Sequence, residues 1–337
     1  MVDGIKIKFT GFWPDWNPED NFIINALKTF TEVELSDEPE YLFSSWFSNE
    51  YRDYDCVKIF YTGENVCPDF NVFDYGIGFE CMDYGDRYLR YPLYYVSELY
   101  GHDYDLMLTK HENVRETLKE KSDFCSFVVS NGTSSAEDLR RVFFEKLSKY
   151  KQVNSGGRYL NNIGEPNGVA DKLAFQTRHK FAIAFENSAH DGYVTEKLVQ
   201  AFAAKTIPIY WGSPKVSSEF NPKGFINCQD YPSLDAVIEQ IKKIDEDDEL
   251  YLSILSEPAL LDDKRSEYDA RLVDFLKNIV SQGTDPMTNQ PAAYRYNRLR
   301  FDRTYLDREK RKDELLPYLD DKLVNFAFQF EKKRLGR

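Results

Sequence analysis

Short apolar runs that end in polar turns alternate along the chain with stretches whose apolar residues have helical spacing. In the first third, residues 5–10, 57–61 and 75–79 predict strands, and residues 20–29 predict an amphipathic helix. An aromatic and acidic loop, residues 12–17, follows the first of these strands. Strands that alternate with helices predict an α/β architecture.

A second series of strands and helices begins after residue 116. Residues 124–129, 181–185 and 206–211 predict buried strands, and the capping-box pattern over residues 134–137 predicts the start of a helix. The order strand, helix, strand predicts a parallel sheet with right-handed crossovers. Ligands of such sheets lie beyond the carboxyl ends of the strands, so we expect the functional residues there.

The composition divides the chain into three parts. The charged segment 110–121 is the predicted boundary between an N-terminal domain, residues 1–115, and a C-terminal domain, residues 116–290. A basic tail, residues 291–337, follows, and residues 295–337 hold 13 basic and 8 acidic side chains. Its apolar residues have helical spacing, which suits attachment to a membrane surface. Packing of this helix back onto the N-terminal domain is the alternative that we favour.

Acidic residues outnumber basic ones in the whole chain, 57 Asp and Glu against 43 Lys and Arg, for a net charge of −14. This balance disfavours a nucleic-acid partner, because phosphate contacts need Lys and Arg. No apolar run approaches the length of a membrane span, the first residues lack the apolar core of a leader, and the five cysteines form no C-x-x-C pair. We therefore expect a cytoplasmic protein. Aromatic residues make up 15% of the chain, and their exposed faces suit stacking on sugar rings.

Several common chemical motifs are missing from the sequence. It has no G-x-G-x-x-G, no P-loop, no H-E-x-x-H and no G-x-S-x-G. The D-x-D triplets at residues 53–55 and 103–105 could hold a divalent metal against a diphosphate, but both precede the predicted nucleotide-binding part. The histidines show no metal-ligand spacing; they are His102, His111, His179 and His190. We expect that no metal is essential.

Residues 180–214 carry the most specific chemistry. A strand there delivers Asn187, and the first turn of the next helix holds Glu196 and Lys197. Free N–H groups at a helix start attract anions, Lys197 adds a positive charge, and Arg140 from the neighbouring unit adds a planar donor. Together they suit a diphosphate. In the alternative interpretation, Glu196 only complements the helix dipole and Lys197 is a surface charge.

The amino-acid sequence of this segment resembles that of a known enzyme family. Phe-Glu-Asn-Ser at residues 185–188, Tyr-Val-Thr-Glu-Lys at 193–197 and Ile-Pro-Ile-Tyr-Trp-Gly-Ser-Pro at 207–214 resemble, in order and spacing, the signature of the α-1,3/1,4-fucosyltransferases. Residues 60–65 and 86–95 resemble the bacterial branch of that family. The resemblance implies two Rossmann-like α/β domains that face a cleft, the GT-B arrangement. The C-terminal domain would bind the donor GDP-β-L-fucose, and the N-terminal domain would present the acceptor.

The resemblance also implies roles for single residues of the donor site. Arg140 and Lys197 would grip the diphosphate. Asn187 and Tyr193 would line the donor site. Glu196 would lie near the ribose or the fucose, where a carboxylate stabilises developing positive charge.

On the acceptor side, Glu64 matches the proposed general base of the family, since inversion in one displacement needs a base opposite the leaving GDP. Trp13, Asp15 and Trp16 are candidates for contacts with the acceptor sugar, with plain packing as the alternative. The implied reaction transfers L-fucose to the 3-hydroxyl of N-acetylglucosamine in lactosamine-type glycans, which gives Lewis-type structures. A 1,4 linkage, another GDP-sugar, or a non-catalytic glycan-binding protein are the remaining alternatives.

Overall fold

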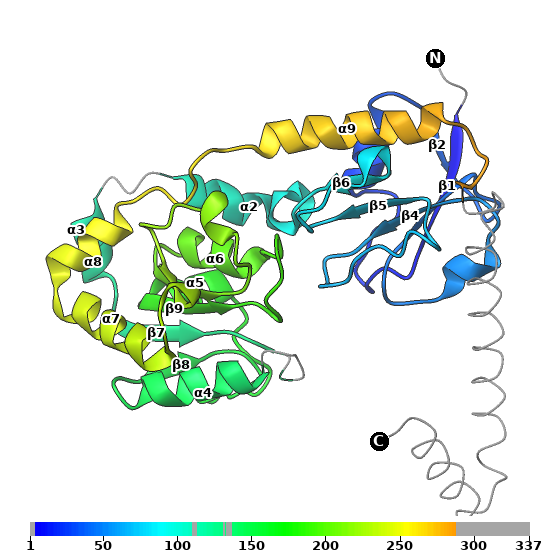
Figure 1. Cartoon of the computed structure of the whole chain (residues 1–337). Coiled ribbons are helices and arrows are strands. Elements are labelled where there is room, and N and C mark those ends of the chain that lie inside the picture. Colours follow the sequence, from blue (N-terminus) through cyan, green and yellow to red (C-terminus); the bar gives the residue numbers. More distant parts are fainter. Residues whose placement is uncertain (1–3, 110–112, 131, 133–136, 288–337) are drawn as a thin grey trace, which may run out of the picture.

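The computed structural model describes residues 4–109, 113–130, 132 and 137–287 of the 337-residue chain. They form two α/β lobes, each built on a parallel sheet (Figure 1). This confirms the predicted fold class of two α/β domains. The predicted basic tail, residues 291–337, lies outside the described residues.

The described strands of the N-terminal lobe form one parallel sheet in the order β2-β1-β3-β4-β5-β6. Helix α1 (Phe22–Lys28) begins where the side chain of Asn21 accepts hydrogen bonds from the amides of Ile23 and Ile24. Its apolar face is buried in the core of this lobe. The strands are β1 (Ile5–Thr10), β2 (Val33–Leu35), β3 (Tyr41–Ser44), β4 (Val57–Tyr61), β5 (Tyr75–Gly78) and β6 (Tyr88–Arg90).

The described strands of the C-terminal lobe form a second parallel sheet in the order β11-β10-β9-β7-β8. These strands are β7 (Asp123–Phe127), β8 (Val153–Ser155), β9 (His179–Phe185), β10 (Ile207–Trp211) and β11 (Ile226–Asn227). The helices are α3 (Val114–Lys119), α4 (Glu137–Ser148), α5 (Lys172–Thr177), α6 (Glu196–Ala203), α7 (Leu234–Glu246) and α8 (Asp248–Leu255). The predicted strands at 124–129, 181–185 and 206–211 are confirmed as β7, β9 and β10.

Two helices pack on the lobe opposite to the one that the predicted boundaries assign. Helix α2 (Ser97–Leu108), inside the predicted N-terminal domain, packs against α6 of the C-terminal lobe. Helix α9 (Arg265–Ser281), inside the predicted C-terminal domain, lies along the N-terminal lobe in contact with α1 and β6 (Figure 1). Leu272, Leu276 and Ile279 of α9 are buried in the same hydrophobic cluster as the apolar face of α1. The chain thus crosses between the lobes twice.

A half-buried ion pair fastens the lobes to each other. Arg90 at the end of β6 binds Glu219 of the C-terminal lobe through two hydrogen bonds, Nη1 to Oε1 at 2.5 Å and Nη2 to Oε2 at 3.1 Å. The hydroxyl of Tyr94 donates to the same Oε2 over 2.9 Å. Burial alone would lower the pKa of Arg90, but the Glu219 carboxylate outweighs it and raises that pKa. Arg90 therefore stays charged, and its contact with Glu219 helps to fix how the two sheets face each other.

None of the helices in the described part of the chain combines the length and apolar character needed to cross a lipid bilayer.

Candidate active site

A cleft of about 360 Å³ lies between the two lobes, at the carboxyl ends of both sheets. Side chains from loops that follow strands of both sheets line it, as the strand-end rule predicts. Of the predicted site residues, the cleft brings together Trp13 and Glu64 from the N-terminal lobe with Asn187, Tyr193, Glu196 and Lys197 from the C-terminal lobe.

The carboxylate of Glu186 organises the start of α6. It follows β9 directly and is fully buried. Its Oε1 accepts a hydrogen bond from the amide of Thr195 (2.7 Å), and its Oε2 accepts from the Thr195 hydroxyl (2.7 Å) and from Nζ of Lys197 (3.2 Å). Burial raises the pKa of Glu186, while the charge of Lys197 opposes that rise. Glu186 therefore anchors both the first turn of α6 and the lysine that lines the cleft.

Lys197 and Glu196 form the charged wall of the cleft. Nζ of Lys197 lies 3.3 Å from Oε1 of Glu196 and 2.9 Å from the hydroxyl of Thr195. Burial alone would lower the pKa of Lys197, but Glu196 and Glu186 together raise it. Burial alone would raise the pKa of Glu196, but Lys197 and Lys172 outweigh it and lower that pKa to about 2. Both groups are therefore ionised at neutral pH.

Lys172, which the sequence does not single out, supports this pair from behind. Its Nζ donates to Oε1 of Gln200 over 2.6 Å, and Nε2 of Gln200 donates to Oδ2 of Asp103 over 2.8 Å. Burial lowers the pKa of Lys172, and the nearby Glu196 carboxylate opposes that change. This chain of contacts links α5, α6 and α2, so the charged wall is braced by three helices.

Arg140 lies behind the wall of the cleft and is not among its lining residues. Only 1% of the residue is exposed. Nη2 donates to the carbonyl of Phe185 (2.7 Å) and to Oδ1 of Asn187 (2.9 Å). Burial lowers its pKa, with Glu186 opposing. Arg140 thus holds Asn187 at the cleft through Nη2, and its direct contact with a diphosphate stays a prediction.

The loop between β9 and α6 presses against the N-terminal lobe at Gly192. This residue has a φ of 85°, and a Cβ there would lie 2.2 Å from the carbonyl oxygen of Phe79. Only glycine fits both the left-handed backbone and this close approach. The contact sets the ring of Tyr193 at 4.6 Å from that of Phe79, centroid to centroid. Burial raises the pKa of Tyr193, which keeps the phenol neutral in the cleft.

Glu64 lines the opposite wall of the cleft, in the loop after β4. The loop is shaped locally, because the Glu64 amide donates to the hydroxyl of Thr62 over 3.1 Å. The next residue, Asn65, donates from its side-chain amide to the hydroxyl of Ser188 in the loop of the other lobe. Among the described residues, no hydrogen bond or ion pair engages the half-buried Glu64 carboxylate. It is therefore available to accept a proton from a bound molecule.

The aromatic loop after β1 separates into two parts. Trp13 lines the cleft together with Phe47, which is 52% exposed. Trp16 instead stacks on Phe12, with ring centroids 4.2 Å apart, and packs against the N-terminal core. Asp15 is exposed and is not among the lining residues. Of the three residues predicted to contact the acceptor, only Trp13 lines the cleft. Phe47 also lines it, although no sequence motif indicates this residue.

The second D-x-D triplet has structural partners. Asp103 binds Gln200, and Asp105 forms an ion pair with Arg265 at 2.7 Å. His179 is fully buried, with Nδ1 2.8 Å from the carbonyl of Phe175, and burial lowers its pKa. These groups therefore serve the fold.

The charges around the cleft suit an anionic leaving group on one side and a proton acceptor on the other. Lys197 is the cation that lines the cleft, and the carboxylates of Glu196 and Glu186 raise its pKa and keep it protonated. A positive charge fixed in a partly desolvated cleft attracts a phosphate strongly.

Two family models match the chain. The description "Alpha-(1,3)-fucosyltransferase FucT N-terminal domain" matches residues 7–97, and "Glycosyltransferase family 10 (fucosyltransferase) C-term" matches residues 118–256. An alpha-(1,3)-fucosyltransferase FucT of Helicobacter pylori is 36% identical over 260 residues, which are 67% of this chain and 53% of that protein. The human 4-galactosyl-N-acetylglucosaminide 3-alpha-L-fucosyltransferase 9 is 32% identical over 140 residues, which are 40% of this chain and 37% of that protein. The chain thus spans about half the length of the bacterial relative.

The fold matches as well. A crystal structure of an alpha1,3-fucosyltransferase with GDP-fucose superimposes with a TM-score of 0.69 and 29% identity, over 83% of this chain and 91% of that chain. Together with the two matched domains and the two-lobed arrangement of the sheets, this likeness identifies the architecture as GT-B. The chain belongs to the glycosyltransferase family 10 fucosyltransferases.

Proposed function

We propose that this protein transfers L-fucose from GDP-β-L-fucose to the 3-hydroxyl of an N-acetylglucosamine residue in a lactosamine-type glycan, with inversion at the anomeric carbon. The observation that carries the proposal is the pairing of Lys197 and Glu64 across one cleft. A fixed cation lines one lobe, and a carboxylate without a protein partner among the described residues lines the other. A single displacement needs both groups: a cation that stabilises the leaving diphosphate and a base that accepts the proton of the acceptor hydroxyl.

In the proposed step, the acceptor hydroxyl gives its proton to the Glu64 carboxylate. The acceptor oxygen forms a bond to C1 of fucose, and the bond from C1 to the diphosphate oxygen breaks. GDP leaves with the electron pair of that bond. General-base assistance typically accelerates such a reaction about 10²–10⁴-fold.

The C-terminal wall stabilises the charge that develops during this step. Lys197 faces the negative charge on the leaving diphosphate, and its raised pKa keeps it protonated. Glu196 is ionised because its pKa is lowered to about 2, and its negative charge stabilises the positive charge that develops on the sugar ring. Arg140 acts through Asn187, which it holds at the cleft. With these groups in place, we propose that no divalent metal is needed for the transfer.

The acceptor side is proposed to bind sugar rings by stacking. Trp13 and the exposed Phe47 line the cleft near Glu64, and aromatic faces of this kind suit the apolar side of a pyranose.

A transfer assay with linkage analysis tests the proposal. The full chain is incubated with GDP-fucose and with N-acetylglucosamine-containing acceptors of both galactose linkages, type 1 and type 2, and the products are analysed by mass spectrometry and NMR. We expect release of GDP and an α-1,3-linked fucose. A 1,4-linked product would correct the linkage, turnover only with another GDP-sugar would correct the donor, and glycan binding without GDP release would contradict a catalytic role.

A further inference from the structure

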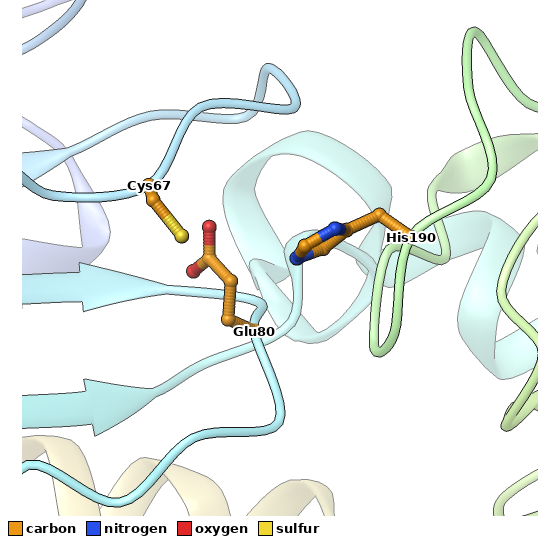
Figure 2. A group of neighbouring side chains, drawn as sticks. All are labelled: Cys67, Glu80 and His190. Carbon is orange, nitrogen blue, oxygen red and sulfur yellow. The ribbon is translucent and has the colours of Figure 1, made fainter.

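Three side chains that the proposed transfer does not use converge beside the cleft, at the contact between the lobes. Cys67 follows the Glu64 loop, Glu80 follows β5, and His190 belongs to the β9–α6 loop of the other lobe. The sulfur, a carboxylate oxygen and a ring nitrogen all lie within 4.8 Å of one another. Figure 2 shows the three side chains pointing toward one another from three separate segments.

The Glu80 carboxylate is the least expected member of this group. The residue is 3% exposed. Its Oε2 accepts a hydrogen bond from the hydroxyl of Tyr88 over 2.9 Å, and the Cys67 thiol lies close enough to hydrogen-bond the carboxylate, but no hydrogen bond to its buried Oε1 is found among the described residues. Gly78 makes room for this group, because a Cβ there would lie 2.7 Å from Oε2. Buried carboxylates in proteins are normally paired with a cation or bound to a metal.

Arg90, a cation of the same lobe that lies near Tyr88, is already engaged. Both Nη atoms of Arg90 bind Glu219, and its Nε donates to the carbonyl of Phe79 over 2.9 Å. The Glu80 carboxylate therefore lies next to an exposed thiol and an exposed imidazole, and these are the two side chains that transition metals prefer.

We propose that Cys67, Glu80 and His190 bind one zinc ion, which joins the two lobes beside the cleft. A thiolate, an imidazole and a carboxylate are all zinc ligands, and a water molecule would complete a tetrahedron. Mg²⁺ and Ca²⁺ prefer oxygen ligands alone, so this set of donors selects against them.

The geometry and the charge both suit zinc. Tetrahedral zinc holds such ligand atoms about 3.3–3.8 Å apart, so the three atoms must approach by roughly 1 Å. Rotation of the exposed side chains of Cys67 and His190 can supply that movement. A divalent ion with one thiolate and one carboxylate is neutral, which favours binding at a half-buried place.

The ion would tie together two loops that carry the proposed catalytic groups. Cys67 lies three residues after Glu64, and His190 lies three residues before Tyr193. These loops already touch through the hydrogen bond from Asn65 to Ser188. A bound ion would therefore stabilise the observed contact between the lobes. The site is defined by its metal affinity and does not depend on the proposed transferase activity.

Metal titration of the full chain tests the proposal. The protein is treated with EDTA, desalted, kept reduced with a phosphine, and titrated with Zn²⁺ against a chromophoric chelator. The variants Cys67→Ser and His190→Gln each remove one ligand at an exposed position. Cys81→Ser is the matched control, because Cys81 is also an exposed free cysteine and directly follows Glu80, but is outside the cluster. Thermal melting of each variant without metal verifies folding.

We expect one zinc ion per chain and a higher melting temperature with zinc in the wild type and in Cys81→Ser. Cys67→Ser and His190→Gln should each bind zinc at least about 100-fold more weakly. Loss of a residue that only hydrogen-bonds to a metal ligand typically lowers metal affinity 10–100-fold, and loss of a ligand itself should have a larger effect. Co²⁺ should give a thiolate charge-transfer band that Cys67→Ser lacks. Less than one zinc ion bound at saturation, or equal affinity in the wild type and both ligand variants, would overturn the proposal.

Discussion

The ion pair between Glu196 and Lys197 allows a stability prediction from the structure. The substitution Glu196→Gln keeps the size of the side chain and removes its charge. In the wild type, Lys197 and Lys172 overcome the effect of burial and lower the pKa of Glu196 from 4.5 to about 2. This difference corresponds to about 3 kcal/mol of stabilisation of the folded state, at 1.36 kcal/mol for each pKa unit. We therefore expect Glu196→Gln to lose up to about 3 kcal/mol of unfolding free energy at pH 7.

The pH dependence has a defined sign. Because the folded-state pKa of Glu196 lies below the unfolded-state value, its contribution is complete above pH 4.5 and is lost as the pH falls toward 2. At pH 3 less than half of the difference between wild type and variant should remain.

Urea unfolding at pH 7 and pH 3, followed by circular dichroism, measures both quantities. Glu239→Gln is the matched control, because Glu239 also pairs with a lysine, at 2.8 Å from Nζ of Lys242, but its side chain is 65% exposed. An exposed pair of this kind typically contributes less than about 1 kcal/mol. The reasoning would be refuted if Glu196→Gln cost no more than Glu239→Gln at pH 7, or if its cost were the same at both pH values.

Three further outcomes are expected. Glu64→Gln should lower the transfer rate about 10²–10⁴-fold with little change in GDP affinity; a wild-type rate in the transfer assay would remove Glu64 as the base. Arg140→Ala should weaken GDP binding at least about tenfold, because Asn187 loses its support at the cleft; unchanged affinity by calorimetry would contradict that positioning role. Arg90→Ala should cost about 3 kcal/mol of unfolding free energy, since it strands the half-buried Glu219 carboxylate; a loss below about 1 kcal/mol in urea would show that the lobes do not depend on the pair.

The sequence predicts the parts of the site that follow from local structure. Apolar runs and strand-end residues are local signals, so they suffice to place Glu64 after β4, Asn187 after β9 and Glu196 in the first turn of α6. The strand-end rule predicts that such side chains lie at the carboxyl ends of their own sheet. The cleft between two lobes is implied only by the resemblance to the family. The chemical roles of these residues stay predictions until the variants are measured.

The remaining features depend on contacts between distant segments. Nothing near Arg140 in the sequence indicates that the helix turns its guanidinium inward, to Phe185 and Asn187. Lys172 comes to lie behind the charged wall only through the packing of α5 on α6. The strands β2, β6 and β8 are three residues long, which is too short to show an alternation of apolar and polar residues. The position of α9 on the N-terminal lobe depends on which distant side chains its apolar face contacts.

The metal cluster is the clearest example of such a contact. Its three members are separated by 13 and 110 positions in the chain, and no spacing rule joins them. The spacing of the histidines in the sequence predicts no metal site, because spacing detects only ligands that are close along the chain. His190 contacts Cys67 and Glu80 only in the folded protein, where the two lobes meet (Figure 2).

A crystal structure of the chain in complex with GDP-fucose would test the central claim most directly. We predict that the diphosphate lies within hydrogen-bonding distance of Nζ of Lys197, and that C1 of fucose faces Glu64 across the cleft. Nucleotide bound outside this cleft, or a sugar turned away from the Glu64 carboxylate, would contradict the account.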